Sequence, residues 1–131
     1  GICCCPPNKE IHKTALGAEE SVEWQYYKET LEAVKALQEE GYTVYAVEQA
    51  HDSITLEEAA EKVESERRKE ESKIAVILGH EVFGVQQEVI DHCSQCIEIP
   101  QYGTKHSMNV SVTAGIVMYR LASSLRLATK K

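Results

Sequence analysis

The stretch IAVILGHEVFGV, residues 74–85, decides the fold. Its first five residues are apolar without interruption and the sixth is glycine, which is typical of a buried parallel strand that ends in a turn. We therefore predict a central strand over Ile74–Leu78 and a short helix over Val85–His92. Gly79 and Gly84 allow positive φ or a close approach of the backbone to a ligand. The stretch predicts a strand, a glycine turn and a helix in succession.

The alternation of strands and helices continues on both sides of this stretch. Asn8 is expected to cap the first helix, Thr55 and Glu58 form a capping box at the start of an acidic surface helix, and Ser107 is expected to cap the last helix. Repeated strand–loop–helix units predict an α/β fold, with a mostly parallel sheet and helices on both faces. Strands are expected at Ile2–Cys5, Tyr42–Val47 and Ile97–Ile99, and helices over Lys9–Leu16, Tyr26–Glu40, within Ser53–Ser72, and from Ser107 to about Leu127.

Two consequences follow from this arrangement. Ligands of parallel sheets bind beyond the carboxyl ends of the strands, which here are Val47–Glu48, Leu78–Gly79 and Ile99–Pro100. The last helix carries apolar residues around most of its circumference, so we expect it to be buried on several sides.

Length and charge limit the class of protein. The chain has 131 residues, which suits one domain, 1–131, and it begins at Gly1 in an apolar segment, so we expect an N-terminally incomplete domain. We find no signal peptide or membrane span and expect a cytoplasmic protein. The formal net charge is −7, yet residues 101–131 hold five basic and no acidic residues. This basic quarter is either a phosphate-facing patch or a complement to a helix dipole.

The cysteines do not indicate a metal site. Their number is five, which argues against a fully paired disulfide framework, and Cys93 and Cys96 form a single CxxC. One CxxC supplies two ligands, and a strand would place Cys4 on the opposite face from Cys3 and Cys5. We therefore expect buried thiols and no metal.

Two segments carry a resemblance to a known family. LGHEVFGV from Leu78, followed by IPQYGTKHSMNVSV from Ile99, resembles the second and third motifs of the SpoU/TrmH family, the RNA ribose 2′-O-methyltransferases of the SPOUT superfamily. The family pattern is roughly LGNE-x-x-G, then IP-x-x-G-x-x-x-SLNVSVA-x-G. HKTALGAEESVEW, from His12, is similar to the stretch after the family's second strand. The matched positions are Leu78, Gly79, Glu81, Gly84, Ile99, Pro100, Gly103, Ser107, Asn109, Val110, Ser111 and Val112.

The resemblance implies a fold, a cofactor and partners. It implies a C-terminal trefoil knot, a homodimer built on the last helix, S-adenosylmethionine as cofactor, and tRNA or rRNA, not DNA or a membrane, as partner. Glu81, Ser107 and Asn109 would meet the acceptor ribose. The cofactor would be held by Leu78, Gly79, Ile99, Pro100, Gln101 and Met108, and RNA phosphates by Lys105, Lys9, Lys13 and Arg120.

Two departures from the family accompany the resemblance. The motif-one segment, with the arginine held to help activate the hydroxyl, has no counterpart in this chain, and His80 stands where the family usually has asparagine. The leading hypothesis is an S-adenosylmethionine-dependent ribose 2′-O-methyltransferase. The alternative is a non-catalytic knotted module that binds cofactor or RNA, or only dimerises. A flavodoxin-type domain ranks last, because Pro6-Pro7-Asn8 follows the first expected strand instead of a glycine-rich phosphate loop.

Overall fold

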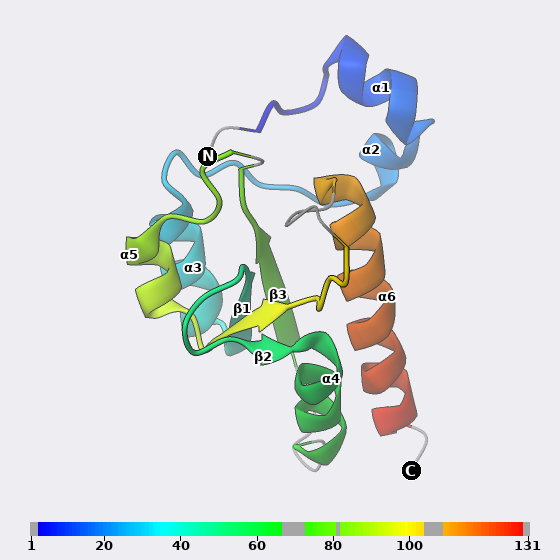
Figure 1. The fold of residues 1–131 in the computed structure, drawn as a ribbon. Helices are drawn as coiled ribbons and strands as arrows, with labels where there is room; N and C mark the ends of the chain where they lie inside the picture. Colours follow the sequence, from blue (N-terminus) through cyan, green and yellow to red (C-terminus); the bar gives the residue numbers. More distant parts are fainter. Residues whose placement is uncertain (1–2, 67–72, 81, 104–108, 130–131) are drawn as a thin grey trace.

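A parallel sheet forms the centre of the protein (Figure 1). The computed structural model describes residues 3–66, 73–80, 82–103 and 109–129. Its strands are β1 (Tyr42–Val47), β2 (Ile54–Thr55), β3 (Lys73–Leu78) and β4 (Gln95–Glu98), in the order β2-β4-β1-β3. Every pairing is parallel, which confirms the predicted α/β class with a parallel sheet. The two-residue β2 was not predicted, because so short a strand carries no periodic pattern.

The position of β3 corrects one prediction. Ile74–Leu78 was expected to be central, but among the described strands β3 pairs with β1 alone and lies at the edge. Its apolar run has another cause: Ile74 and Val76 pack against one core, and Ala75 and Ile77 against the other. Helices cover both faces of the strand, so both sets of alternating side chains must be apolar.

Two helices cover one face of the sheet. They are α3 (Thr30–Glu39) and α5 (Gln87–His92), and Val34, Val89 and Val44 of β1 form the core between them and the sheet. The predicted start of α3 at Tyr26 was four residues early, since the backbone of Glu29 is still extended and the first helical residue is Thr30. Its predicted end at Glu40 agrees to within one residue, because the helix ends at Glu39 and Gly41 has a φ of +92°, a conformation that favours glycine.

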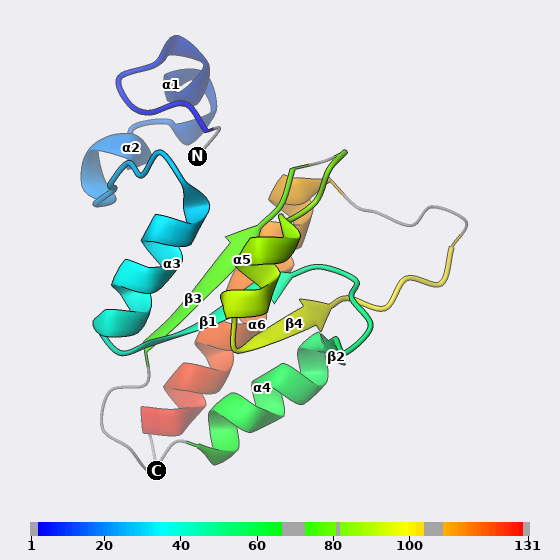
Figure 2. The same ribbon diagram turned by 90° about the vertical axis from the view of Figure 1, so that its left-hand side faces the viewer.

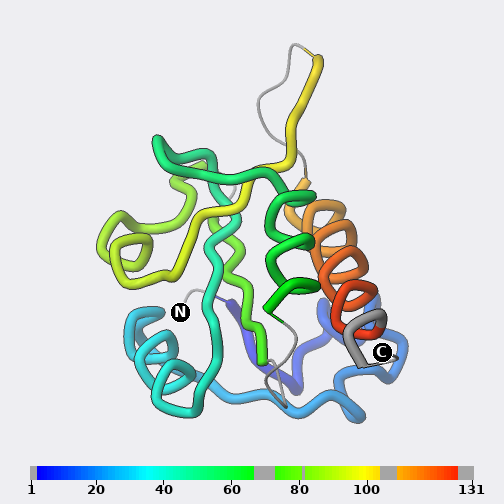
Figure 3. Tube along the Cα trace, turned by 90° about the horizontal axis from the view of Figure 1, so that it is seen from below, coloured from blue at the N-terminus to red at the C-terminus, as the bar shows by residue number. Residues whose placement is uncertain are grey.

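The other two long helices cover the opposite face. These are α4 (Leu56–Ser65) and α6 (Val110–Thr129), which run side by side to the right of the strands in Figure 3. The Thr55 hydroxyl accepts a hydrogen bond from the backbone N–H of Glu58 at 3.2 Å, as the capping box predicts. The core on this face contains Tyr45, Leu56, Ala59, Ala60, Val63, Ile97, Val117 and Leu121.

The last helix differs from its prediction in two respects. It begins at Val110, because the Asn109 side-chain oxygen accepts the backbone N–H of Ser111 at 2.8 Å; the predicted cap, Ser107, lies outside the described residues. The helix is also not buried on several sides within this chain. Val117, Leu121 and Ser124 are buried, whereas the opposite face is exposed, because the part of the chain that the structure describes packs α4 and the sheet against one face of α6 only.

The N-terminal region lies apart from the sheet (Figure 2). Helix α1 (Lys9–Ala15) begins at Asn8, whose side chain accepts the N–H groups of Glu10 and Ile11, as predicted, and a short α2 (Ala18–Ser21) follows. Neither helix contains a buried residue. The predicted strand at Ile2–Cys5 is not formed over Cys3–Cys5, because this segment pairs with none of the described strands.

The cysteines follow the predicted burial only in part. Cys96 is buried, Cys5 and Cys93 are half-buried, and Cys3 and Cys4 are exposed. Cys3 and Cys4 belong to the segment that lies outside the sheet, so no core covers them.

Candidate functional site

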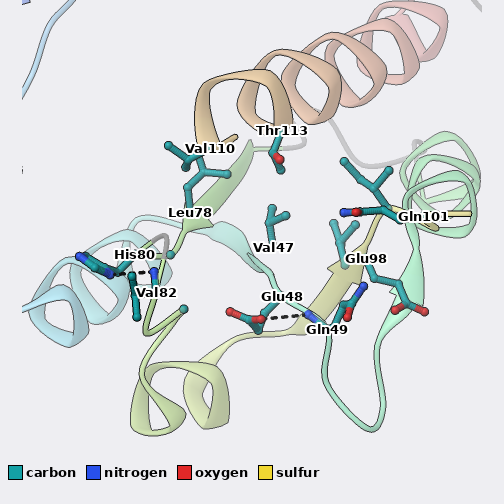
Figure 4. Close-up of a pocket in the computed structure, with 14 residues that line it drawn as sticks. Val47, Glu48, Gln49, Leu78, His80, Val82, Glu98, Gln101, Val110 and Thr113 are labelled. Carbon is teal, nitrogen blue, oxygen red and sulfur yellow. Dashed lines mark hydrogen bonds between the residues drawn. The ribbon is translucent and has the colours of Figure 1, made fainter. Parts of the chain in front are cut away.

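The carboxyl ends of three strands meet at one cavity, which we call the strand-end cavity. The register pairs Val47 of β1 with Leu78 of β3 and with Ile97 of β4, so the residues after these strands emerge at one level. The first turn of α6 lies over them (Figure 4). The cavity volume is about 350 Å³, within the range of small-molecule sites. It is lined by Val47, Glu48, Gln49, Leu78, Gly79, His80, Val82, Gly84, Ile97, Glu98, Ile99, Gln101, Val110 and Thr113.

A tight turn after β3 forms one wall of this cavity. The backbones of His80 and Gly84 exchange two hydrogen bonds, of 3.2 and 2.8 Å. A Cβ atom at Gly79 would lie 2.6 Å from both the Gly84 carbonyl carbon and the Val85 nitrogen. Gly84 itself has a φ of +66°. The two glycines therefore let the turn fold back on the end of β3, so Gly79 is required by the chain's own backbone.

The imidazole of His80 holds this turn from inside. Its Nδ1 accepts the backbone N–H of Val82 at 3.0 Å and that of Phe83 at 3.3 Å (Figure 4 shows the first). Because Nδ1 acts as an acceptor, the proton of the neutral ring lies on Nε2. The His80 ring also stacks on Phe83, with 5.0 Å between the ring centroids. His80 thus caps the turn as an asparagine side-chain oxygen would.

The carboxylate of Glu48 joins the end of β1 to the same turn. It accepts the backbone N–H of Val85 at 3.0 Å and that of Gln49 at 3.2 Å, and a Cβ at Gly84 would collide with it. Sequence reasoning placed Val47–Glu48 at a strand end but gave Glu48 no role. The signal was its position directly after a strand, whereas its partner, 37 residues away, became visible only in the fold.

The structure places most of the predicted cofactor residues together. Leu78, Gly79, Ile99 and Gln101 all line the strand-end cavity. Pro100 lies between two lining residues but does not itself line it. Met108 lies outside the described residues. Besides Glu48, the lining residues that sequence reasoning missed are Val47, Gln49, Val82, Ile97, Glu98, Val110 and Thr113.

Of the three predicted catalytic residues, only Asn109 is described. Its Oδ1 caps α6 through Ser111, and its backbone oxygen accepts the N–H of Thr113 at 3.0 Å. Thr113 lines the strand-end cavity, so Asn109 stands at the helix end that faces the cavity. Glu81 and Ser107 lie outside the described residues.

The predicted phosphate-binding residues fall into two groups. Lys9 and Lys13 are exposed on α1, beyond the same end of the sheet as the strand-end cavity (Figure 1). Arg120 instead ties α6 to α4: it donates to Glu57 at 3.0 to 3.2 Å and to the buried Ser124 at 2.8 Å. Lys105 lies outside the described residues.

The strand-end cavity combines apolar and acidic walls. Val47, Leu78 and Ile97, at or near the ends of their strands, contribute apolar side chains. Glu48 and Glu98 contribute carboxylates. Among the described residues, no three His, Cys, Asp or Glu side chains gather closely enough to hold a metal ion, and none of the described helices has the length and apolar character that a bilayer span requires. The cavity suits a small molecule with an apolar portion and positive or hydrogen-donating groups.

Curated relatives and solved structures are similar to most of this chain. It is 32% identical over 111 residues to a tRNA (guanosine(18)-2′-O)-methyltransferase of Borreliella burgdorferi, covering 85% of this chain and 47% of the relative. It is 28% identical over 115 residues to a 23S rRNA (guanosine-2′-O-)-methyltransferase of Neisseria meningitidis, covering 85% and 40%. The chain thus spans about half the length of these relatives.

The fold itself matches that of solved enzymes. An A. aeolicus TrmH/SpoU tRNA modifying enzyme superposes with a TM-score of 0.72 at 21% identity, over 91% of this chain and 54% of that one. An AdoMet-bound rRNA methyltransferase from Sinorhizobium meliloti gives 0.77 at 18% identity, over 95% and 44%. The sequence model of the SpoU rRNA Methylase family matches residues 2–119 of this chain. Both the motifs around the strand-end cavity and this match over nearly the whole length show that the chain belongs to the SpoU rRNA Methylase family.

Proposed function

We propose that this chain binds S-adenosylmethionine in the strand-end cavity and takes part in methylating a ribose 2′-hydroxyl of tRNA or rRNA. The observation that carries the proposal is the convergence of Leu78, Gly79, Ile99 and Gln101, which resemble family motif positions, on one cavity. The names of the relatives support both RNA classes as substrates, because one acts on tRNA and another on 23S rRNA.

The lining of the cavity fits this cofactor. S-adenosylmethionine carries an adenine face, a sulfonium and an ammonium group. Strand-end side chains such as Leu78 and Ile97 offer apolar contact for the base. Glu48 and Glu98 supply negative charge for the cationic part, and no Lys or Arg occurs among the lining residues that are described. Leu78, Gly79, Ile99 and Gln101, with Pro100 and Met108 in the same motifs, would hold the cofactor.

The chain's residues would serve mainly to position the ribose hydroxyl relative to the methyl group of the cofactor. When bound, the cofactor supplies a methyl group on a sulfonium: the ribose oxygen forms the new C–O bond, the C–S bond breaks, and the hydroxyl proton leaves to a base. Asn109 has its Oδ1 engaged with Ser111, which leaves its amide N–H groups to donate to the ribose. Together with Glu81 and Ser107 it would fix the hydroxyl in line with the methyl group.

The exposed face of α6 supports a homodimer. Val112, Ile116 and Tyr119 are 52%, 40% and 78% exposed, and their spacing places them on one helix face. A second copy packed there would cover apolar side chains that this chain leaves in solvent. We also propose that residues 1–131 form one domain whose C-terminal segment is a trefoil knot, as the family resemblance implies.

Within this proposal, RNA phosphates meet Lys105, Lys9 and Lys13. Arg120 contributes less to that contact, since its guanidinium is held by Glu57 and Glu64. Binding should weaken with salt, at a slope of about 0.9 or less per phosphate contact.

Two measurements on the full-length protein test the function. Calorimetric titration with S-adenosylmethionine should show binding, and the labelled methyl group should appear on a ribose 2′ oxygen of tRNA or rRNA. Cofactor binding without transfer to either RNA would favour the alternative, a non-catalytic module. Absence of both would contradict the proposal.

A substitution at Gly79 tests the placement of the site. Gly79→Val should abolish cofactor binding, because its side chain collides with Gly84 and Val85 and displaces the turn that walls the cavity. Glu61→Val, at an exposed residue of α4 that does not line the cavity, is the control and should leave cofactor affinity unchanged. Unchanged cofactor affinity in a folded Gly79→Val protein would contradict the placement.

A further inference from the structure

A second cavity adjoins the strand-end cavity. Its volume is about 670 Å³, and it shares Glu48, Gln49, Val82 and Gly84 with its neighbour. The turn after β3 therefore stands between the two spaces, with Val82 facing both. Phe83, the next residue, lines the second cavity only. A ligand that occupies both cavities would pass this turn.

The side chain of Phe83 is an exposed aromatic ring held in a defined place. It is 84% exposed, although large apolar side chains are usually covered. One side of its ring stacks on His80, whose Nδ1 also accepts the Phe83 backbone N–H at 3.3 Å. His80 thus orients the ring while leaving its other side open. Such a ring is a ready platform for a nucleobase, because every base has a face that can stack.

The charges in the second cavity indicate which part of a nucleotide fits. Among its described lining residues none is Lys or Arg, whereas Glu48, Asp52 and Asp91 carry carboxylates. Burial raises the pKa of the Cys93 thiol to about 11, so this group stays neutral and adds no charge. A phosphate would be repelled by such a wall, while a neutral base with hydrogen-bond donors would be accepted.

Hydrogen-bonding groups in the cavity favour one base. Gln87 donates to the Asp91 carboxylate at 2.9 Å, and Glu48 is already used by the turn. The Asp52 carboxylate makes no hydrogen bond to the described residues, although its backbone oxygen accepts from Gln95. Guanine presents two adjacent donors, N1–H and N2–H, which match the two oxygens of a free carboxylate. Adenine and the pyrimidines have no such donor pair.

We propose that the second cavity is a guanine-binding subsite, in which the base of the target nucleotide stacks on Phe83 and donates to Asp52. The proposal rests on the proposed function and names the nucleoside whose ribose would lie at the strand-end cavity. RNA bases that are read individually are splayed out of their strand and stacked on aromatic side chains, which is the arrangement that this turn offers.

A titration followed by nuclear magnetic resonance tests the subsite directly. Phe83 is the single phenylalanine of the 131 residues, so ring-labelled phenylalanine gives one set of reporter signals. Guanosine, adenosine and ribose 5-phosphate are added, with and without S-adenosylhomocysteine, up to about 10 mM, since one stacked base is expected to bind in the millimolar range. Guanosine should shift the Phe83 signals saturably and more tightly than adenosine, and ribose 5-phosphate should not shift them.

A variant at Asp52 in the second cavity tests whether its carboxylate selects guanosine over adenosine. Asp52→Ala should weaken guanosine binding and leave adenosine binding unchanged, whereas Glu61→Ala, which removes an exposed acid of α4 outside this cavity, should change neither. The proposal is overturned by the absence of a saturable guanosine shift, by an equal shift with ribose 5-phosphate, or by equal guanosine affinity in Asp52→Ala.

Kinetic measurements with RNA distinguish a failure of the subsite proposal from a failure of the proposed function. In the full-length enzyme, Phe83→Ala should raise KM for RNA about tenfold or more, Phe83→Trp should restore it, and S-adenosylhomocysteine affinity should not change. Tyr26→Ala, at another exposed aromatic residue (56% exposed), is the control. Methylation with an unchanged KM in Phe83→Ala overturns the subsite alone. Guanosine binding without methylation of any RNA supports the subsite and contradicts the proposed function.

Discussion

The two long faces of α6 are both apolar in sequence, but they differ in what covers them. Val117 and Leu121 are 0% and 4% exposed against α4 and the sheet, whereas Val112 and Tyr119 are 52% and 78% exposed. Hydrophobicity alone therefore identifies side chains that need a partner, without saying whether the partner is in the same chain. Within the described residues, one half of this helix is covered by the rest of the chain and the other half is left exposed.

Polar groups also join the covered face of α6 to α4. Arg120 donates to Glu57 of α4 and to Ser124, and the Ser124 hydroxyl in turn donates to Glu64 at 3.0 Å. Ser124 is fully buried, so its hydrogen bonds avoid the cost of a buried unpaired hydroxyl. This network defines which face of α6 meets α4.

The largest effect is expected on the covered face. Leu121→Ala should lower the free energy of unfolding by about 2–5 kcal/mol, because it removes buried methyl groups and leaves a cavity. Urea denaturation at a protein concentration that keeps the chain monomeric measures the change. Met118→Ala, at a residue that is 55% exposed, is the control and should lower the free energy of unfolding much less. Equal losses in the two variants would contradict the difference between the faces.

A substitution on the exposed face of α6 should change the stability of the proposed dimer and leave the fold of the monomer unchanged. Ile116→Asp should raise the dissociation constant of the dimer by about a hundredfold or more, since a charge would be buried without a partner. Sedimentation velocity over a range of concentrations measures it, while circular dichroism should show an unchanged fold. A parent protein that stays monomeric at every concentration would refute the dimer.

A smaller change on the same helix sharpens the comparison. Gly115 has nothing within 4 Å of the position that a Cβ would take, so Gly115→Ala should stabilise the monomer by about 1 kcal/mol through helix propensity. Thermal unfolding at low concentration checks this gain. If a second copy approaches the backbone closely at Gly115, the same variant should dimerise less well. A destabilised monomer would show that this face is not free.

The smallest effect concerns pH at the joint between α4 and α6. The hydrogen bonds from Arg120 lower the pKa of Glu57 below its ordinary value. A lowered folded-state pKa means that the contribution to stability is present above the unfolded pKa and is lost as the pH falls. Unfolding midpoints between about pH 6 and pH 3 should therefore fall slightly less in Glu57→Gln than in the parent. Identical pH profiles of the two proteins would show that the exposed Arg120–Glu57 pair contributes nothing measurable to the free energy of unfolding.

Local signals in the sequence predicted several elements correctly. Tyr42–Val47 is a strand with the predicted bounds, Asn8 and Thr55 cap their helices, and Gly41 ends α3. Each of these depends on interactions within a few residues of the chain. Four of the residues predicted to hold the cofactor line the strand-end cavity, because a parallel sheet brings the carboxyl ends of its strands together.

Interactions between distant segments escaped the same reasoning. The link from Glu48 to Val85 spans 37 residues, and no pattern near Glu48 indicates its partner. His80 was recognised as a departure from the family's asparagine, but its cap on the turn depends on the placement of the Val82 and Phe83 N–H groups. The strand expected at Ile2–Cys5 had an apolar composition, yet Cys3–Cys5 pairs with none of the described strands.

By itself, the sequence determined the alternation of strands and helices, the family motifs and the strand ends that meet at the strand-end cavity, because these depend on local propensity and on general properties of parallel sheets. Within the described residues, the tertiary structure alone decided that β3 lies at the edge of the sheet, that one face of α6 is covered and the other exposed, and that the exposed Phe83 lines the second cavity. The reason is that burial is a property of pairs of surfaces: an apolar side chain requires a partner, and only the fold shows which surface provides it.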